Sequence, residues 1–101
     1  VDVKRFDFVV KTKIKTYLIE VNFYNTQGSK PNETARAYSD LAPKINQYAK
    51  YEFVWITDGQ GWLPSKNKLE EAYNNIPSMY NLTTLSTFIE KIKTENVLTE
   101  W

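Results

Sequence analysis

Two segments near the start of the chain alternate apolar and polar side chains with a period of two. Residues 5–11 and 16–24 are rich in aromatic and β-branched residues, and this alternation is typical of β-strands. The polar, lysine-rich segment 11–15 between them predicts a hairpin tip, without the Asn-Gly or Asp-Gly pair that would fix a turn type. On one face of the hairpin we expect Phe6, Phe8 and Val10 from the first strand, and Tyr17, Ile19, Val21 and Phe23 from the second strand. The opposite face carries Arg5, Asp7, Val9, Leu18, Glu20, Asn22 and Tyr24.

A long amphipathic helix is predicted next. Residues 25–31 are rich in turn formers and indicate a loop. Asn32 is a suitable N-cap, and Glu33 lies in the first turn, where the helix dipole favours an anion. Pro43 is expected to kink this helix or to divide it in two. The apolar positions that recur at helical spacing are Ala35, Tyr38, Leu41, Ala42, Ile45 and Tyr48.

The second half of the chain predicts one buried strand and two further helices. Residues 53–56 are continuously apolar and follow a helix, so we expect a strand parallel to an earlier one. Ser65 is expected to cap a helix that Pro77 stops, and Thr83 or Thr84 is expected to open the last helix. The order strand, strand, helix, strand, helix, helix predicts an α/β fold with a mixed sheet flanked by helices.

Composition narrows the chemistry that such a fold can carry. The 101 residues suit a single domain, and the absence of cysteine and histidine excludes disulfides, the usual zinc sites and His-based catalysis. Carboxylate and amide oxygens remain, and these suit Mg²⁺, Ca²⁺ or Mn²⁺. No apolar run approaches the roughly 20 residues of a membrane span, so we expect no membrane partner and a cytoplasmic location.

Charge is distributed unevenly along the chain. The net charge is +1, but residues 1–36 hold seven basic and four acidic residues. This excess of positive charge fits a phosphate-facing surface and a solvated hairpin equally well.

One pair of acids stands out in the predicted hairpin. If the hairpin closes symmetrically about Lys13 and Ile14, Asp7 lies directly across from Glu20, with Cβ atoms roughly 4.5–5.5 Å apart. Opposed carboxylates repel each other, and a bridging divalent cation would turn that repulsion into binding. Asn22 adds an amide on the same face. The alternative is that both acids are solvent-facing residues of an amphipathic hairpin; their apolar neighbours in sequence favour the metal site.

The wider sequence resembles a known family of nucleases. An Asp on one strand followed by Glu-x-Asn on the next is similar to the PD-(D/E)xK nuclease core, and the similarity runs over roughly residues 4–90. The segments that carry it are Arg5–Phe8, Tyr17–Tyr24, Gly28–Lys30, Asn32–Arg36 and Phe53–Trp62. Together they resemble the catalytic region of DpnII/MboI-type type II restriction endonucleases.

The resemblance implies an enzyme that cuts both strands of duplex DNA at unmethylated GATC with Mg²⁺, for which Mn²⁺ is a potential substitute. Asp7 and Glu20 would be the metal ligands, and Asn22 would complete the catalytic set where the superfamily has a lysine. Lys30 is then the nearest candidate to supply the missing positive charge. The superfamily core has a helix and a strand ahead of the Asp strand, so we expect residues 1–101 to be a catalytic domain truncated at its N-terminus. Cleavage at a palindromic site suggests a homodimer.

Several nearby residues are candidates for accessory roles, each with a simpler alternative. Glu33 could hold a second metal or a metal-bound water, or be an ordinary first-turn acid. Ser29 and Lys30, just before the helix, could contact a phosphate or belong to a plain loop. Arg36 is a candidate phosphate or base contact, or a surface arginine, and Tyr24 is expected to line the site.

Two other functions remain open on the sequence. One is a nuclease of the same superfamily that acts in repair or phage defence with another or no sequence preference. The second is a non-catalytic module that binds DNA or a partner chain, which the amide at Asn22 keeps open because it cannot stabilise charge as an ammonium does.

Overall fold

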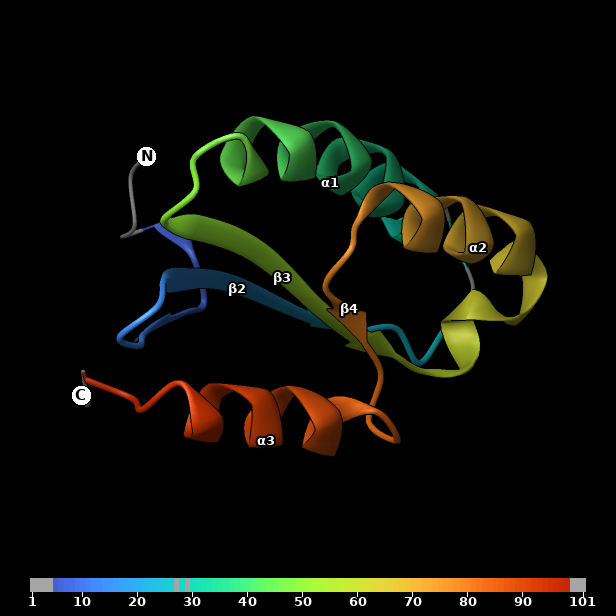
Figure 1. The fold of residues 1–101 in the computed structure, drawn as a ribbon. Helices are drawn as coiled ribbons and strands as arrows, with labels where there is room; N and C mark the ends of the chain where they lie inside the picture. Colours follow the sequence, from blue (N-terminus) through green and yellow to red (C-terminus); the bar gives the residue numbers. More distant parts are fainter. Residues whose placement is uncertain (1–4, 27, 29, 99–101) are drawn as a thin grey trace.

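The computed structural model describes residues 5–26, 28 and 30–98, which form a mixed sheet between two layers of helices (Figure 1). Helices α1 (Lys30–Asn46) and α2 (Lys66–Asn75) cover one face, and α3 (Leu85–Thr94) covers the other. The strands are β1 (Phe8–Lys11), β2 (Thr16–Phe23), β3 (Tyr51–Asp58) and β4 (Met79–Tyr80), and the 3₁₀ segment η2 (Gln60–Ser65) precedes α2. The predicted α/β class is confirmed. No helix in the described part is long and apolar enough to cross a membrane.

The strands lie in the spatial order β1-β2-β3-β4. β1 pairs antiparallel with β2, and β2 pairs in parallel with β3, as predicted for the buried strand. The prediction missed β4, which pairs in parallel with β3 over Trp55↔Met79 and Ile56↔Tyr80. Two residues are too few to show an alternation, so this strand exists only because its neighbour offers an open edge.

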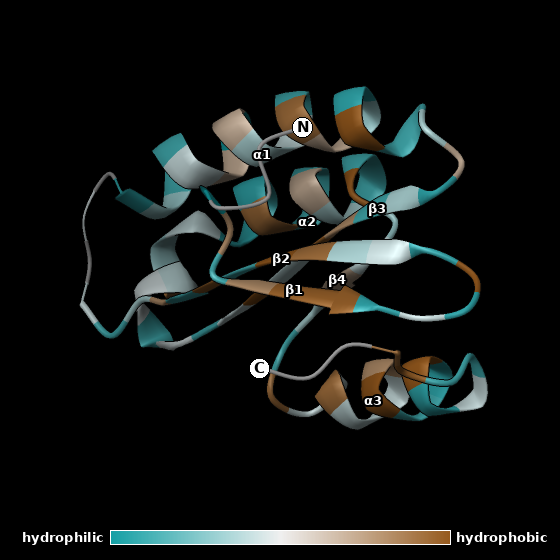
Figure 2. Cartoon of the chain, turned by 90° about the vertical axis from the view of Figure 1, so that its left-hand side faces the viewer, coloured by the Kyte–Doolittle hydropathy of each residue, from teal (hydrophilic) through white to brown (hydrophobic). Residues whose placement is uncertain are grey.

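The hairpin has the predicted symmetric register, with Phe8 opposite Ile19. Its tip is held by Thr12, whose Oγ1 accepts hydrogen bonds from the backbone N–H groups of Ile14 (3.1 Å) and Lys15 (3.2 Å). A threonine side chain therefore organises the turn in place of an Asn-Gly pair. Figure 2 shows hydrophobic residues along β1 and along α3, and it shows α3 on the opposite side of the sheet from α1 and α2.

The first strand starts later than expected. Residues 5–7 bend, and β1 begins only at Phe8. Because of this bend, Phe6 packs beside Phe53 at a centroid separation of 6.3 Å, in the same cluster as Val9. The prediction that Phe6 and Val9 point to opposite faces is therefore wrong.

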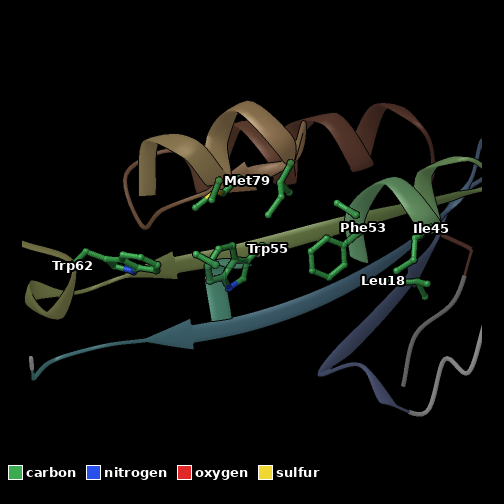
Figure 3. Close-up of a cluster of buried hydrophobic side chains, with 10 residues drawn as sticks. Leu18, Ile45, Phe53, Trp55, Trp62 and Met79 are labelled. Atoms are coloured by element: carbon green, nitrogen blue, oxygen red, sulfur yellow. The ribbon is translucent and has the colours of Figure 1, made fainter. Parts of the chain in front are cut away.

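The central strands β2 and β3 are buried on both faces. On the side of α1 and α2 the core contains Leu18, Phe53 and Trp55 (Figure 3). On the side of α3, Tyr17 and Phe88 pack edge to face at 5.4 Å. Alternate side chains of β2 therefore enter different cores, so Glu20 and Asn22 lie on the side that α1 covers.

Helix boundaries differ from the sequence expectation in two places. Helix α1 starts at Lys30, so Asn32 lies inside its first turn and is not the N-cap. Pro43 does not divide the helix, which continues to Asn46 with Ala42 and Ile45 buried on either side of it. A proline removes one hydrogen bond from the helix, and burial of these neighbours offsets that loss.

Candidate active site

The glutamate of the candidate site lies in the middle of the sheet. Glu20 belongs to β2, opposite Trp55 of β3, and its carboxylate is half-buried beneath α1. Its Oε2 accepts a hydrogen bond from the Tyr38 hydroxyl at 2.9 Å, and its Oε1 accepts one from the Asp7 backbone N–H at 3.2 Å. Both carboxylate oxygens are therefore oriented by the protein.

Asp7 lies one residue before β1, at the open end of the hairpin, and is exposed. Its Oδ2 accepts a hydrogen bond from the backbone N–H of Val21 at 2.9 Å. Each acid thus accepts an N–H from the opposite segment, Asp7 from Val21 and Glu20 from Asp7. The two side chains continue the hydrogen bonding of the hairpin past Phe8, where the backbone ladder ends. The predicted juxtaposition of Asp7 and Glu20 is present.

The electrostatic state of the pair reflects this geometry. Burial raises the pKa of Glu20, and the neighbouring Asp7 charge raises it further, while the hydrogen bonds from the Tyr38 hydroxyl and the Asp7 N–H oppose the rise. A carboxyl whose pKa is raised by burial and by a neighbouring carboxylate is a group whose charged form a divalent cation would stabilise.

The pair fits the coordination preferences of Mg²⁺. This ion is usually bound through one or two carboxylates and keeps several waters or substrate phosphate oxygens. Within the described ranges, no three acidic side chains come close enough to form a metal cage. The arrangement can therefore hold an ion through Asp7 and Glu20 on one side and leave its other positions to water and phosphate.

Asn22 lies two residues beyond Glu20 on the same side of β2, and its amide is anchored from below. The indole Nε1 of Trp55 donates to the side-chain oxygen Oδ1 of Asn22 at 3.0 Å. The hydroxyl of Thr57 donates to the backbone carbonyl of Asn22 at 2.7 Å. The amide oxygen is thus engaged by the core, so the amide NH₂ is the group of Asn22 that can act on a substrate.

A groove of about 530 Å³ opens beside Glu20, between the bent segment before β1 and the C-terminal half of α1. Arg5 and Lys44 bring two positive charges to it. Its other lining residues are Phe6, Tyr38, Leu41, Ile45, Gln47 and Tyr48. Basic groups beside a half-buried acid suit a polyanionic ligand better than an apolar one.

The accessory candidates are not all brought to this place. Lys30 and Glu33 are exposed in the first turn of α1, and Ser29 lies outside the described residues. Arg36 lines a separate hollow of about 210 Å³ between α1 and α2, whereas the groove beside Glu20 lies along another side of α1. Arg36 is therefore not brought to the acidic pair.

Tyr24 is engaged in the core. Its hydroxyl donates to the Thr34 hydroxyl at 2.8 Å, and its ring packs edge to face on Trp62 at 5.6 Å. Burial raises the pKa of Tyr24, while the Thr34 hydrogen bond opposes the rise. The side chain joins the segment after β2 to α1 and is only partly exposed.

The sequence pattern predicts only packing for Tyr38 and Trp55, yet their polar atoms bind Glu20 and Asn22. A signal was present, because a buried tyrosine hydroxyl or indole N–H needs a partner. Periodicity could not say which partner each would find, since that depends on how α1 crosses the sheet.

Comparison with known proteins gives a consistent result. A family model described as DpnII restriction endonuclease matches residues 1–91. The type II restriction enzyme MboI of Moraxella bovis is 68% identical over 100 residues, which cover 99% of this chain and 36% of that protein. The type II restriction enzyme DpnII of Streptococcus pneumoniae is 52% identical over 88% of this chain and 31% of its own length. MjaIII of Methanocaldococcus jannaschii, also a type II restriction enzyme, is 46% identical over 78% of this chain and 28% of its own length.

The chain therefore spans about a third of the length of these relatives. No solved structure matches it. The family that matches is the one that the residues around Asp7 and Glu20 resemble, so that prediction is confirmed.

Proposed function

The chain belongs to the DpnII restriction endonuclease family, and on that premise we propose that it carries the metal-binding part of a type II restriction endonuclease active site. The reaction is hydrolysis of phosphodiester bonds in duplex DNA, with unmethylated GATC as the site. The observation that carries the proposal is the acid pair: Asp7 and Glu20 lie together at one end of a hairpin, where a bound cation would neutralise the charges of both carboxylates.

Asp7 and Glu20 would hold Mg²⁺, or Mn²⁺ in its place. Such an ion lowers the pKa of a bound water and neutralises charge on the phosphate, which requires neither histidine nor cysteine. The hydrogen bonds from Tyr38 and from the Asp7 N–H orient both oxygens of Glu20 for this purpose.

Asn22 takes the place of the superfamily lysine as a neutral hydrogen-bond donor. Its amide NH₂ can orient a water or a phosphate oxygen, but it brings no positive charge. Lys30 at the start of α1 is one source of that charge, and Arg5 and Lys44 in the groove beside Glu20 are two others. Double-stranded DNA is the partner, and a homodimer of the full-length protein in the bacterial cytoplasm matches the symmetry of a palindromic site.

The neutral side chain of Asn22 favours a second candidate function, which is DNA binding without cleavage. If the neutral amide cannot replace the lysine, the domain binds DNA without cutting it. This alternative predicts that the full-length protein retains DNA binding in the presence of Mg²⁺ but leaves the duplex intact.

The test uses the full-length protein and duplexes that contain one GATC, either adenine-methylated or unmethylated. We expect Mg²⁺-dependent cleavage of the unmethylated duplex only. Asp7→Ala should abolish cleavage, while Asp40→Ala, an exposed acid on α1 away from the site, should cut normally. Cleavage at other sequences would indicate a different nuclease of the superfamily. Binding without cleavage by the unaltered protein would refute the enzymatic proposal.

A further inference from the structure

Two hydrogen bonds connect the candidate site to one layer of aromatic rings in the core. Tyr38 of α1 donates to Glu20 Oε2 at 2.9 Å, and Trp55 of β3 donates to Asn22 Oδ1 at 3.0 Å. The two donor residues are themselves in contact, with ring centroids 5.0 Å apart and planes at 88°. The groups that hold Glu20 and Asn22 therefore belong to a single packed unit.

This aromatic layer has little freedom to move. Trp55 is fully buried, and its ring packs on Trp62 at 5.7 Å, as Figure 3 shows for the two indoles. Tyr38 also packs edge to face on Phe53 at 5.3 Å. Edge-to-face aromatic pairs add roughly 0.5–1.5 kcal/mol each beyond their area burial. The donors are thus fixed in position before any ligand binds.

The chemistry of the indole determines which end of the Asn22 amide faces outward. An indole N–H is a donor only, so it can pair with the amide oxygen and not with the amide nitrogen. The neighbouring Trp62 indole reaches the same residue indirectly, because it donates to Thr57 Oγ1 at 2.9 Å and Thr57 donates to the Asn22 carbonyl. Trp55 therefore selects the orientation in which Asn22 presents its NH₂ group as a donor.

The Tyr38 hydroxyl acts in the same way on Glu20. Since the Asp7 N–H takes Oε1 and Tyr38 takes Oε2, the carboxylate cannot rotate without breaking one of the two bonds. Losing the hydroxyl leaves Glu20 with one anchor and frees its terminal torsion.

We propose that Tyr38 and Trp55 are positioning residues, Tyr38 for the Glu20 carboxylate and Trp55 for the Asn22 amide. The proposal rests on the function proposed above, since it assigns these residues to the same metal site. Groups that orient a metal ligand typically change metal affinity or activity by about 10–100-fold when they are removed.

The first test measures metal binding without catalysis. Mn²⁺ is titrated into the full-length protein, and free Mn²⁺ is followed by electron paramagnetic resonance. Tyr38→Phe keeps the ring and removes the hydroxyl, so we expect the dissociation constant to rise by about 10-fold. The matched control is Tyr48→Phe, because Tyr48 lines the same groove and is exposed. Thermal unfolding of both variants checks that any difference is not a loss of folding.

Asp7→Ala in the same titration tests the metal site separately from the positioning role of Tyr38. If Asp7→Ala binds Mn²⁺ as the unaltered protein does, the acid pair is not the metal site and the proposed function fails. If Asp7→Ala loses binding while Tyr38→Phe and Tyr48→Phe match the unaltered protein, the positioning role of Tyr38 is refuted and the metal site stands.

The second test addresses Trp55 through a double-mutant cycle on the cleavage rate. If Trp55 acts through the Asn22 amide, Trp55→Phe lowers kcat by about 10-fold when Asn22 is present. The same substitution has little further effect on kcat in an Asn22→Ala background. A purely structural role would lower the rate by the same factor in both backgrounds and would overturn the assignment for Trp55. If Trp55→Phe does not fold, Trp55 is assigned to stability alone, and the proposal stands or falls on Tyr38→Phe.

Discussion

Neutralising Glu52 tests how much a half-buried cluster of charges stabilises the fold. Glu52 lies in β3, where its Oε1 accepts a hydrogen bond from Lys15 Nζ of the hairpin at 3.1 Å. Its Oε2 lies 3.6 Å from Lys91 Nζ of α3 and accepts a hydrogen bond from the Ser78 hydroxyl before β4. One carboxylate thus connects the hairpin, the last helix and the edge strand to the centre of the sheet.

The expected cost of Glu52→Gln follows from the exposure of the partners. Breaking a fully buried ion pair costs about 3–5 kcal/mol, whereas exposed pairs contribute about 0–1 kcal/mol. The Glu52 side chain is 14% exposed, but Lys15 and Lys91 are 27% and 43% exposed and can regain hydration. The amide also still accepts from Ser78. We therefore expect the free energy of unfolding to fall by about 1–2 kcal/mol at pH 7.

The pH dependence of stability gives a second, independent test of the Glu52 cluster. Burial alone would raise the pKa of Glu52, but hydrogen bonds from Ser78 and Lys15 and the charges of Lys91 and Lys15 lower it below its ordinary value. A carboxyl whose pKa is lower in the folded state stabilises the fold above its unfolded pKa of about 4.3, and this contribution is lost as the pH falls through the folded pKa. The difference between wild type and Glu52→Gln should therefore shrink below pH ~4.

Urea unfolding followed by tryptophan fluorescence, from pH 7 down to pH 3, measures both effects. The matched control is Glu90→Gln, because Glu90 and Lys93 are paired at 3.7 Å but are 72% and 66% exposed. That variant should change stability by less than about 0.5 kcal/mol. Stability curves of wild type and Glu52→Gln that stay parallel down to pH 3, or an equal loss in Glu90→Gln, would refute the reasoning.

Three further predictions concern the hairpin, a loop and the last helix. Asp7→Asn keeps an acceptor for the Val21 N–H and removes the repulsion from Glu20. In urea unfolding at pH 7, the free energy of unfolding should therefore rise or stay within about 1 kcal/mol of wild type. Mn²⁺ binding should be lost. Gly59→Ala should destabilise by more than about 2 kcal/mol in thermal unfolding, because Gly59 has φ +118° and an added Cβ would collide with the Tyr24 carbonyl; Gly28→Ala, with open space around it, should be neutral. Phe88→Ala should cost about 3–5 kcal/mol, since Phe88 is the buried residue of α3, and hydrogen exchange should show α3 losing protection before β2 and β3.

The features that the sequence could predict are those set by local patterns. The symmetric closure of the hairpin about Lys13 and Ile14 predicted that Asp7 lies across from Glu20, and the pairing of Phe8 with Ile19 gives that register. A one-residue slip would move every side chain of β2 to the other core, so the apolar alternation specifies the register strongly. The continuous apolar run of β3 likewise predicted burial on both faces and a parallel partner.

The features that the sequence could not predict depend on contacts between distant segments. Phe6 follows the alternation of a strand, but the chain bends before Phe8 because Phe6 gains a partner in Phe53. Asn32 has the chemistry of an N-cap, yet α1 starts at Lys30 and leaves the buried Asn32 Oδ1 without a hydrogen-bond partner among the described residues. In both cases tertiary packing overrides a valid local preference.

The acid pair has a structural role as well as the proposed chemical one, and this explains how the fold tolerates it. β1 begins one residue after Asp7, so the Val21 N–H on β2 faces a position that β1 does not reach. The Asp7 carboxylate accepts this N–H, and the Glu20 carboxylate accepts the N–H of Asp7. Hydrogen bonds to charged groups contribute about 1.5–3 kcal/mol each, which is enough to offset the repulsion between opposed carboxylates before a metal arrives. An alanine at Asp7 therefore removes a hairpin contact and a metal ligand together, and only the asparagine variant, which keeps the acceptor, isolates the charge.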